Sequence, residues 1–220
     1  MGPSTRTILI AGATGLVGSS VVQQALDDPR FGRVIVLVRR VPAITHPKLE
    51  VWVAEDLLSA LRDARVDAVL CCLGTTIAKE GGDRARFIHV DKDLVVGLAK
   101  WAARQKVAVF NVVSSIGADP GARVFYSRIK GEVEVELKAL GFPVLHLFRP
   151  SVLVGPRKEF RFGERISAAI MGTLGPLLPD RYRPMQHDVL ARAMLNAVFD
   201  PQGGTHAYRS IRSMAGRRSP

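Results

Sequence analysis

Tyr126 and Lys130 are four residues apart, a spacing that puts two side chains on the same face of a helix. A nearby ammonium group favours the phenolate, so it lowers the pKa of a tyrosine from about 10 towards neutral pH and makes the phenol a usable proton donor and acceptor. Ser114 and Ser115 precede this pair at the end of an apolar run, where a hydroxyl group can hold a substrate oxygen. Such a Tyr and Lys pair is often structural, so its place in the fold decides between the two roles.

The elements that must position these residues alternate between strands and helices. Runs of aliphatic residues predict six strands, at 7–11, 34–38, 49–53, 68–73, 108–113 and 144–148. Helical patterns follow at 16–26, 83–105 and 126–140, the last of them ended by Gly141. Continuous apolar strands that alternate with helices predict an α/β fold with a doubly wound parallel sheet, covered on both faces.

One segment of the helix predicted at 126–140 argues against it, because residues 132–137 alternate polar and apolar side chains with the period of a strand. We still expect a helix, since Lys130, Glu134 and Lys138 would then form opposite-charge pairs on one face.

The pattern loosens after Pro150, where prolines and glycines interrupt short apolar stretches. We expect a single domain over residues 1–220, in which residues 151–186 form a small substrate-side cap. A last helix is predicted at 188–199 with Asp188 as its N-cap, followed by an edge strand at 206–211.

A glycine-rich stretch stands directly between the first predicted strand and its helix. It reads Gly12-Ala13-Thr14-Gly15-Leu16-Val17-Gly18. Backbone N–H groups at a helix N-terminus bind a pyrophosphate, and glycines remove the side chains that would block its approach. Tight helix packing is the alternative explanation of the glycines, but the strand–turn–helix position favours a dinucleotide site.

Arg39 and Arg40 follow the second strand, where a dinucleotide-binding fold places the residue that contacts the ribose. Proteins that bind NAD usually have an acid there, whereas two guanidinium groups offer charge and paired donors to a 2′-phosphate. This pattern predicts NADPH as the cofactor, with a solvated basic loop as the alternative.

Two further strand ends point to the same ligand. Asp56-Leu57 follows the third strand, where the carboxylate would accept a hydrogen bond from the adenine amino group or cap a short helix. Leu73-Gly74-Thr75 follows the fourth strand, and a turn of small residues there would pass close to the nicotinamide ribose.

Five stretches of the chain, taken in order, resemble the signature motifs of a known family, the short-chain dehydrogenase/reductases, and specifically their atypical NAD(P)-binding Rossmann members related to the Tat-interacting-protein oxidoreductases. They are Gly12-x-x-Gly15-x-x-Gly18, Cys72-Leu73-Gly74-Thr75-Thr76, Val113-Ser114-Ser115-Ile116-Gly117-Ala118, Tyr126-x-x-x-Lys130-Gly131-Glu132 and Arg149-Pro150. The resemblance covers about residues 5 to 200.

The resemblance implies an NADPH-dependent oxidoreductase that transfers hydride between the nicotinamide and a small carbonyl or alcohol substrate. It implies Tyr126 as the catalytic acid/base, Lys130 as the group that lowers its pKa and binds the nicotinamide ribose, and Ser114 or Ser115 as the partner of the substrate oxygen. Some members of the family bind NADPH with little turnover, so an NADPH-binding regulatory or scaffold protein is the alternative.

Three residues after the sixth strand also enter the cofactor site by resemblance. Val152 and Leu153 would lie beside the nicotinamide, and Arg149 belongs to the same cofactor-binding set. Asp91 falls where many relatives have an Asn that supports a proton relay, and this departure leaves the relay open.

Composition bounds the remaining functions. The formal charge of +11 comes from dispersed arginines without a nucleic-acid-binding motif, so we expect no specific nucleic-acid partner. No apolar stretch is long enough to span a bilayer, and the five histidines show no metal-ligand spacing, so neither a membrane span nor a metal site is expected. The adjacent Cys71 and Cys72 cannot form a disulfide, from which we expect a cytoplasmic protein. Monomer and homodimer both remain open.

Overall fold

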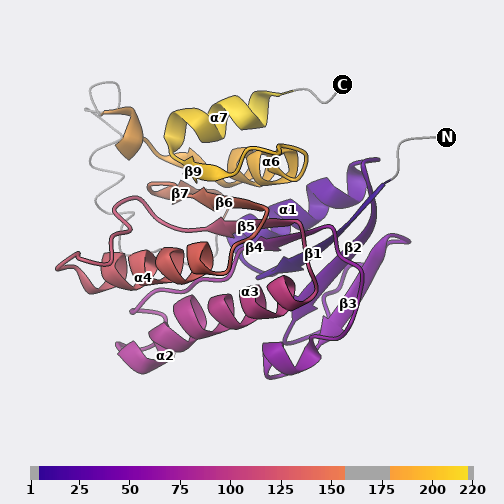
Figure 1. Ribbon diagram of the computed structural model, residues 1–220, viewed down its shortest axis with the longest axis horizontal. Helices are drawn as coiled ribbons and strands as arrows, with labels where there is room; N and C mark the ends of the chain where they lie inside the picture. The colour runs from indigo at the N-terminus through magenta and orange to yellow at the C-terminus, as the bar shows by residue number, and fades with distance from the viewer. Residues whose placement is uncertain (1–4, 157–178, 218–220) are drawn as a thin grey trace.

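A parallel sheet of seven strands runs through the middle of the molecule in the order β3-β2-β1-β4-β5-β6-β9. The computed structural model describes residues 5–156 and 179–217. The strands are β1 (Arg6–Ala11), β2 (Phe31–Val38), β3 (Leu49–Val53), β4 (Ala68–Cys71), β5 (Val109–Val113), β6 (Val144–Phe148) and β9 (Gly204–His206). Their order reverses between β1 and β4, which is the switch point where open α/β sheets bind ligands (Figure 1). The predicted doubly wound parallel sheet is confirmed.

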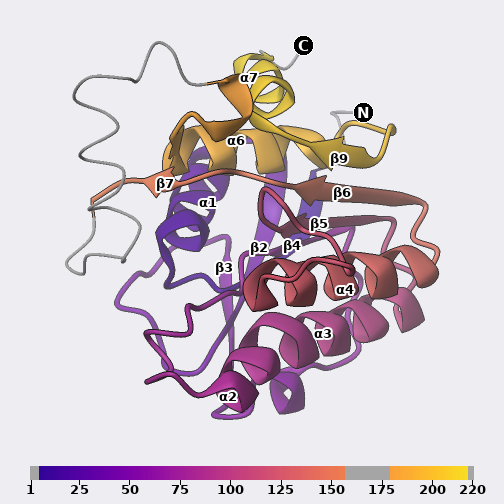
Figure 2. The ribbon, with the colours of Figure 1, turned by 90° about the vertical axis from the view of Figure 1, so that its left-hand side faces the viewer.

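Helices cover both faces of this sheet (Figure 2). One face carries α1 (Leu16–Asp27), α6 (His187–Ala197) and α7 (Tyr208–Gly216), and the other carries α2 (Arg84–Ile88), α3 (Leu94–Arg104) and α4 (Phe125–Ala139). Alternate residues of β1 face the two layers: Ile8 and Ile10 pack on the α1 side, whereas Leu9 and Ala11 pack on the α3 side. A strand segment buried on both faces must be apolar at every position, as residues 8–11 of β1 are.

Shorter elements complete the chain. They are the 3-10 turns η1 (Leu57–Ala60) and η4 (Asp180–Tyr182), the π-helical turn η2 (His89–Asp93), and a separate parallel pair of strands, β7 (Leu153–Val154) and β8 (Met185–Gln186). The pair β7 and β8 lies within the predicted cap of residues 151–186, of which residues 157–178 are outside the described part of the chain.

The long helix predicted at 83–105 is interrupted in its first half. Asp83 caps it by accepting hydrogen bonds from the backbone N–H groups of Ala85 and Arg86. The chain then passes from α2 through the π-helical turn η2 into α3. The extra residue of a π turn is a local change in hydrogen bonding that an apolar stripe does not reveal, and such turns are frequent at functional sites.

Two expectations near the C-terminus are wrong. Asp188 is not the N-cap of α6, because the helix begins at His187 and Asp188 lies in its first turn. The strand predicted at 206–211 is β9 followed by the helix α7. Ile211, Met214 and Ala215 share one face of that helix and are buried against α6, so packing at helical spacing decides the local structure.

Helix α4 is confirmed, but the ion pairs expected along it are not. Lys130 pairs with Asp91, and Glu134 pairs with Arg149, so the two do not neutralise each other. Lys130 and Glu134 are both buried. The strand-like alternation of residues 132–137 arises in part because Val135, an apolar residue, is about half exposed on the outer face of the helix.

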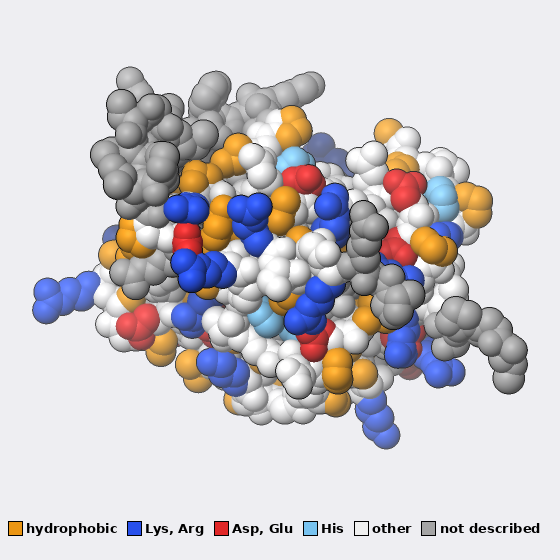
Figure 3. Space-filling model, turned by 90° about the horizontal axis from the view of Figure 1, so that it is seen from above, with side chains coloured by type: hydrophobic (Ala, Val, Ile, Leu, Met, Phe, Trp, Pro, Cys, Tyr) orange, Lys and Arg blue, Asp and Glu red, His pale blue; other side chains and the backbone are white. Residues whose placement is uncertain are grey.

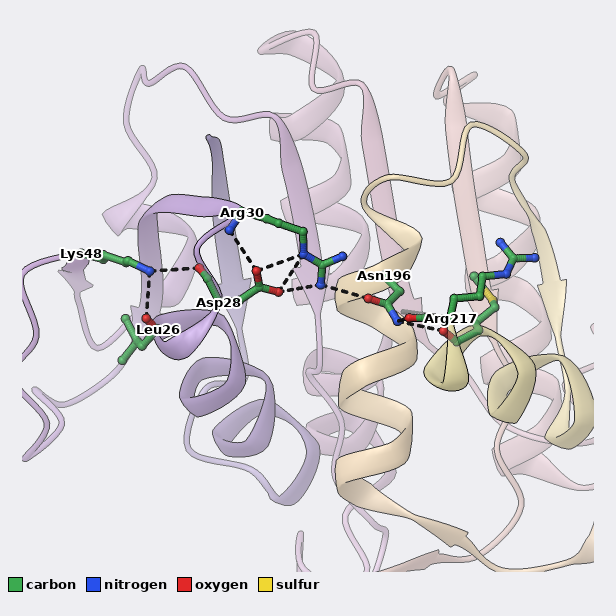
Figure 4. A network of polar contacts seen from close by, with 7 residues as sticks. Leu26, Asp28, Arg30, Lys48, Asn196 and Arg217 are labelled. Atoms are coloured by element: carbon green, nitrogen blue, oxygen red, sulfur yellow. Dashed lines mark hydrogen bonds and ion pairs between the residues drawn. The ribbon is translucent and has the colours of Figure 1, made fainter. Parts of the chain in front are cut away.

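A polar network fastens the C-terminal helices to the N-terminal half of the sheet (Figure 4). Arg30 forks onto the Asp28 carboxylate and donates to Asn196 Oδ1 at 3.0 Å. Asn196 on α6 in turn donates to the carbonyl of Met214 at 2.8 Å and to that of Arg217 at 3.2 Å, at the end of α7. The network links α6 and α7 to the segment that follows the C-terminal end of α1.

Candidate functional site

A cleft of about 1220 Å³ opens at the carboxyl ends of β1 and β4, at the switch point of the sheet. The predicted cofactor residues that line it are Gly12, Ala13, Thr14, Gly15, Leu16, Arg39, Asp56, Leu57, Leu73, Gly74 and Thr75. They come from the loops after four consecutive strands, which a parallel sheet brings together at one edge.

Two positions of the glycine loop, Gly12 and Gly18, leave no room for a side chain. Gly12 has a φ of +79°, and a Cβ atom there would lie 2.6 Å from the backbone of Cys72. A Cβ atom on Gly18 would lie 2.1 Å from the carbonyl oxygen of Gly12, so α1 packs directly on the loop. Val17 and Gly18 therefore support the loop from behind and do not line the cleft. The first turn of α1, whose N–H groups have no partner within the helix, faces the cleft after Gly15.

The two arginines after β2 are exposed, and Arg39 lines the cleft while Arg40 does not. Neither makes an ion pair or hydrogen bond with the residues that the structure describes. Glu55 lies at the same cleft, after β3. The Arg39 guanidinium is thus available to an anionic ligand.

Asp56 performs the capping role that the sequence left open. Its Oδ1 atom accepts a hydrogen bond from the Leu58 N–H at 3.1 Å and thereby starts the turn η1. Asp56 is at the same time exposed and lines the cleft.

Lys130 is buried immediately behind the cleft wall. A Cβ atom on Gly74 would lie 3.7 Å from Lys130 Nζ and 3.4 Å from Asp91 Oδ1, and Gly74 itself lines the cleft. Lys130 Nζ is 2.8 Å from Asp91 Oδ1. Burial acts to lower the pKa of Lys130, but the Asp91 carboxylate, with a smaller contribution from Tyr126, outweighs it and holds that pKa above its ordinary value.

Tyr126 stands one turn before Lys130 on α4 and is half-buried. Its ring lies 5.8 Å from the ring of Phe87 on α2, centroid to centroid. Tyr126, Lys130, Ser114 and Ser115 lie outside the lining of the cleft itself. Tyr126 acts on Lys130 from the same helix, and Lys130 in turn lies against Gly74 in the cleft wall.

The two serines after β5 differ in their surroundings. Ser114 is buried, and its hydroxyl donates to Glu134 Oε1 at 2.5 Å. The same carboxylate accepts hydrogen bonds from Nε and Nη2 of Arg149, at 2.8 and 2.5 Å. Ser115 is half-buried and donates only to the neighbouring carbonyl of Ile116 at 3.2 Å. Arg149 is therefore committed to Glu134 and does not line the cleft.

Val152 and Leu153 lie outside the lining of the cleft, whereas Pro156, four residues after Val152, lines it. Other lining residues that sequence reasoning missed are Ser19, Leu37, Val38, Glu55, Leu58, Cys72, Lys79, Glu80, His89, Val90 and Leu94. Several adjoin a predicted residue and could have been found by extending each strand-end motif. His89, Val90 and Leu94 come from η2 and α3, where the sequence carries no such signal.

Burial makes both cysteines poor nucleophiles. Burial raises the pKa of Cys71 to about 11 and raises that of Cys72 further, although Cys72 borders the cleft. Among the described residues there is no group of three or more His, Cys, Asp or Glu that would hold a metal ion. Within 5–156 and 179–217, no helix combines the length and apolar character that a membrane span requires.

The basic side chains do not gather into one patch on the face that carries α6 and α7. Figure 3 shows Lys and Arg there interleaved with acidic and apolar side chains. Such a surface does not resemble the continuous basic stripe of a nucleic-acid-binding face.

A family model described as NAD(P)H-binding matches residues 12–139, which include the glycine loop, the whole of α4 and every described cleft-lining residue except Pro156. The chain belongs to this NAD(P)H-binding family. It is 34% identical over 205 residues to the protein HTATIP2 of Rattus norvegicus, an alignment that covers 90% of this chain and 84% of that protein. It is 37% identical over 172 residues to the mitochondrial protein FMP52 of Eremothecium gossypii, covering 77% and 75% of the two chains. The chain is an HTATIP2-like, NAD(P)-binding Rossmann protein.

Solved structures that share this fold include a sugar-nucleotide epimerase and an enzyme in complex with NAD⁺. The UDP-N-acetylglucosamine 4-epimerase of Methanobrevibacter ruminantium matches with a TM-score of 0.67 at 15% identity, over 96% of this chain and 81% of the epimerase. The Bordetella bronchiseptica enzyme WbmH, solved with NAD⁺, matches with a TM-score of 0.66 at 18% identity, over 92% and 74% of the two chains. At these identities the likeness shows a shared fold and nothing more.

The names of the relatives contradict one expectation. Proteins of Aspergillus fumigatus and Eremothecium gossypii that match this NAD(P)H-binding chain at 34% and 37% identity are named mitochondrial. The cytoplasmic localisation expected from the cysteines is therefore wrong. Two free thiols show only that no structural disulfide forms between them, which does not distinguish one reducing compartment from another.

Proposed function

We propose that the protein is an NADPH-dependent oxidoreductase of the short-chain type that interconverts a small carbonyl compound and its alcohol. The observation that carries this proposal is the contact at Gly74, where the wall of the cofactor cleft meets the buried Lys130 beside Tyr126. The lysine that would lower the pKa of the candidate acid/base thus lies directly behind the wall of the nucleotide cleft.

The residues present fit a dinucleotide. The glycine loop, which close packing at Gly12 and Gly18 holds against Cys72 and α1, and the start of α1 beyond it suit a pyrophosphate. The unpaired Arg39, with Arg40 beside it, supports the choice of NADPH over NADH, because a guanidinium binds a 2′-phosphate through charge and paired donors. NADPH supplies the hydride when bound.

Within the proposed reaction Tyr126 gives its phenolic proton to the carbonyl oxygen as the carbonyl carbon is reduced. Lys130 favours the phenolate that remains and is near enough to the cleft wall to bind the ribose. Ser115 is the better candidate to orient the substrate oxygen, because the Ser114 hydroxyl already donates to Glu134. Residues 151–186 would cap the substrate.

The experiment that tests this function measures oxidation of NADPH with a panel of small aldehydes and ketones, for the wild type and for Tyr126→Phe. We expect the variant to lose at least about 100-fold in kcat, the size of a general-acid contribution, while its Kd for NADPH changes less than twofold. Tyr208→Phe on α7, away from the cleft, is the matched control.

Equal turnover by Tyr126→Phe would remove this residue from the mechanism. If the wild type binds NADPH but reduces no compound in the panel, the cofactor-binding regulatory protein becomes the better account.

A further inference from the structure

Asp91 is a buried carboxylate with no role of its own in the reaction proposed above. Its side chain is 1% exposed, and that of its partner Lys130 is 7% exposed. Removing two charges from water costs free energy that their attraction often fails to recover, so an ion pair at such depth calls for an explanation beyond stability.

The Asp91 carboxylate joins three segments of the chain. Its Oδ1 atom lies 2.8 Å from Lys130 Nζ on α4, and its Oδ2 atom accepts the backbone N–H of Thr75 at 2.7 Å. Thr75 and Gly74 belong to the loop that lines the cleft. The π-helical turn η2 carries Asp91 at its centre. The carboxylate therefore fixes the cleft wall and the lysine relative to each other.

The other charged or titratable groups around Lys130 do not replace Asp91. Tyr126 acts on it from the same helix, and the Cys71 thiol of β4, whose pKa burial raises to about 11, faces it without a charge at neutral pH. Glu134, one turn further along α4, is held by Arg149 and Ser114. Among the described residues, Asp91 is the one carboxylate in contact with this ammonium.

We propose that Asp91 is a positioning residue, which keeps the buried ammonium of Lys130 charged and fixed against the cleft wall at Gly74, next to Tyr126. The proposal deepens the function above and rests on it for its catalytic meaning. Without the carboxylate, a buried amine with no counter-charge loses its proton at a much lower pH. Lys130 would then no longer stabilise the phenolate of Tyr126.

Asp91→Asn tests the charge with little change in shape. Both partners of Asp91 are donors, and an amide offers one oxygen, so either the Thr75 N–H or the Lys130 ammonium is left facing an NH₂ group. Asp93→Asn is the matched control, because Asp93 lies in the same turn and is exposed.

The first measurement is thermal unfolding of the free protein between pH 6.5 and 9.5, which needs neither cofactor nor turnover. We expect Asp91→Asn to unfold about 10 °C below the wild type at pH 7. The deficit should shrink as the pH rises, because the unfolded chain keeps its lysine proton up to about pH 10 whereas the folded variant has already lost it. Asp93→Asn should follow the wild type at every pH.

A second variant separates charge from simple loss of contacts. Adding Lys130→Met to Asp91→Asn removes the unpaired amine, so the double variant should recover part of the lost stability at pH 7 and lose the dependence on pH. A deficit that stays constant with pH, or a double variant that is less stable than Asp91→Asn, would overturn the proposal and leave Asp91 a purely structural residue.

The second measurement concerns the reaction. At each pH, kcat of Asp91→Asn is divided by kcat of the wild type. This ratio should fall about tenfold or more between pH 6.5 and 9, because Lys130 of the variant loses its charge in that range. A ratio that is constant over this range would contradict the catalytic role. Failure of the wild type to reduce any carbonyl refutes the proposed function alone, since the unfolding measurement still decides whether Asp91 holds the charge.

Discussion

At the scale of single residues, the site depends on which polar groups are free and which are already engaged. Glu134 holds both Ser114 and Arg149, whereas Ser115 has only a weak donor contact to its neighbour. Arg39 faces the cleft without a partner among the described residues. A group that has no protein partner is the one that a ligand can use without first breaking a contact.

Replacing Arg39 and Arg40 together by Ala should weaken NADPH binding about 10- to 100-fold, because one charge-assisted contact to a phosphate contributes about 1.5–3 kcal/mol and Arg39 alone of the two lines the cleft. NADH lacks the 2′-phosphate, so its Kd should change less than threefold. Fluorescence titration of both nucleotides at fixed ionic strength measures the two losses. The pair Arg65→Ala and Arg104→Ala, both exposed and away from the cleft, controls for net charge. Equal losses for NADPH and NADH would exclude recognition of the 2′-phosphate.

At the scale of elements, sequence reasoning succeeds where one local requirement decides the structure. The apolar runs place β1 to β6, and the need for a positive φ and close packing at Gly12 and Gly18 places the cofactor loop. It fails where distant segments decide. The pairing of Asp91 with Lys130 joins residues 39 positions apart, and α7 is helical because Ile211 and Met214 pack on α6. Neither contact can be inferred from the local pattern of polar and apolar residues.

Asn196→Ala should loosen α7, because this side chain links Arg30 to the last carbonyls of that helix. Loss of these partly buried hydrogen bonds should cost about 1–3 kcal/mol of the free energy of unfolding, measured by urea denaturation. Hydrogen exchange of α7 should rise while exchange in β1 stays slow. Gln23→Ala, exposed on α1, is the control. Unchanged exchange in α7 would show that its apolar face alone holds it in place.

At the scale of the whole molecule, stability should depend on pH through two histidines at the β9 edge of the sheet. His146 is fully buried, its Nδ1 lies 2.9 Å from His206 Nε2, and its Nε2 lies 3.3 Å from the Asp200 carbonyl. Burial, joined by the neighbouring His146, lowers the pKa of His206 to about 4, and burial also lowers that of His146 despite Asp200. The folded protein therefore resists protonation of both imidazoles, and His206 stays neutral down to about pH 4.

The sign of the effect follows from proton counting. Between about pH 6.5 and 4 the unfolded chain binds a proton at His206 while the folded chain does not, and the lowered pKa of His146 acts in the same direction. The free energy of unfolding therefore falls as the pH falls. Allowing for the partial exposure of His206, we expect a loss of about 1–2 kcal/mol between pH 7 and 5, measured by urea denaturation. In His206→Gln that loss should be about half as large, whereas His89→Gln, an exposed histidine on η2, should leave it unchanged. An equal loss in His206→Gln and wild type would mean that other groups, such as the ion-paired Asp28 and Asp200 carboxylates, govern acid unfolding already above pH 5.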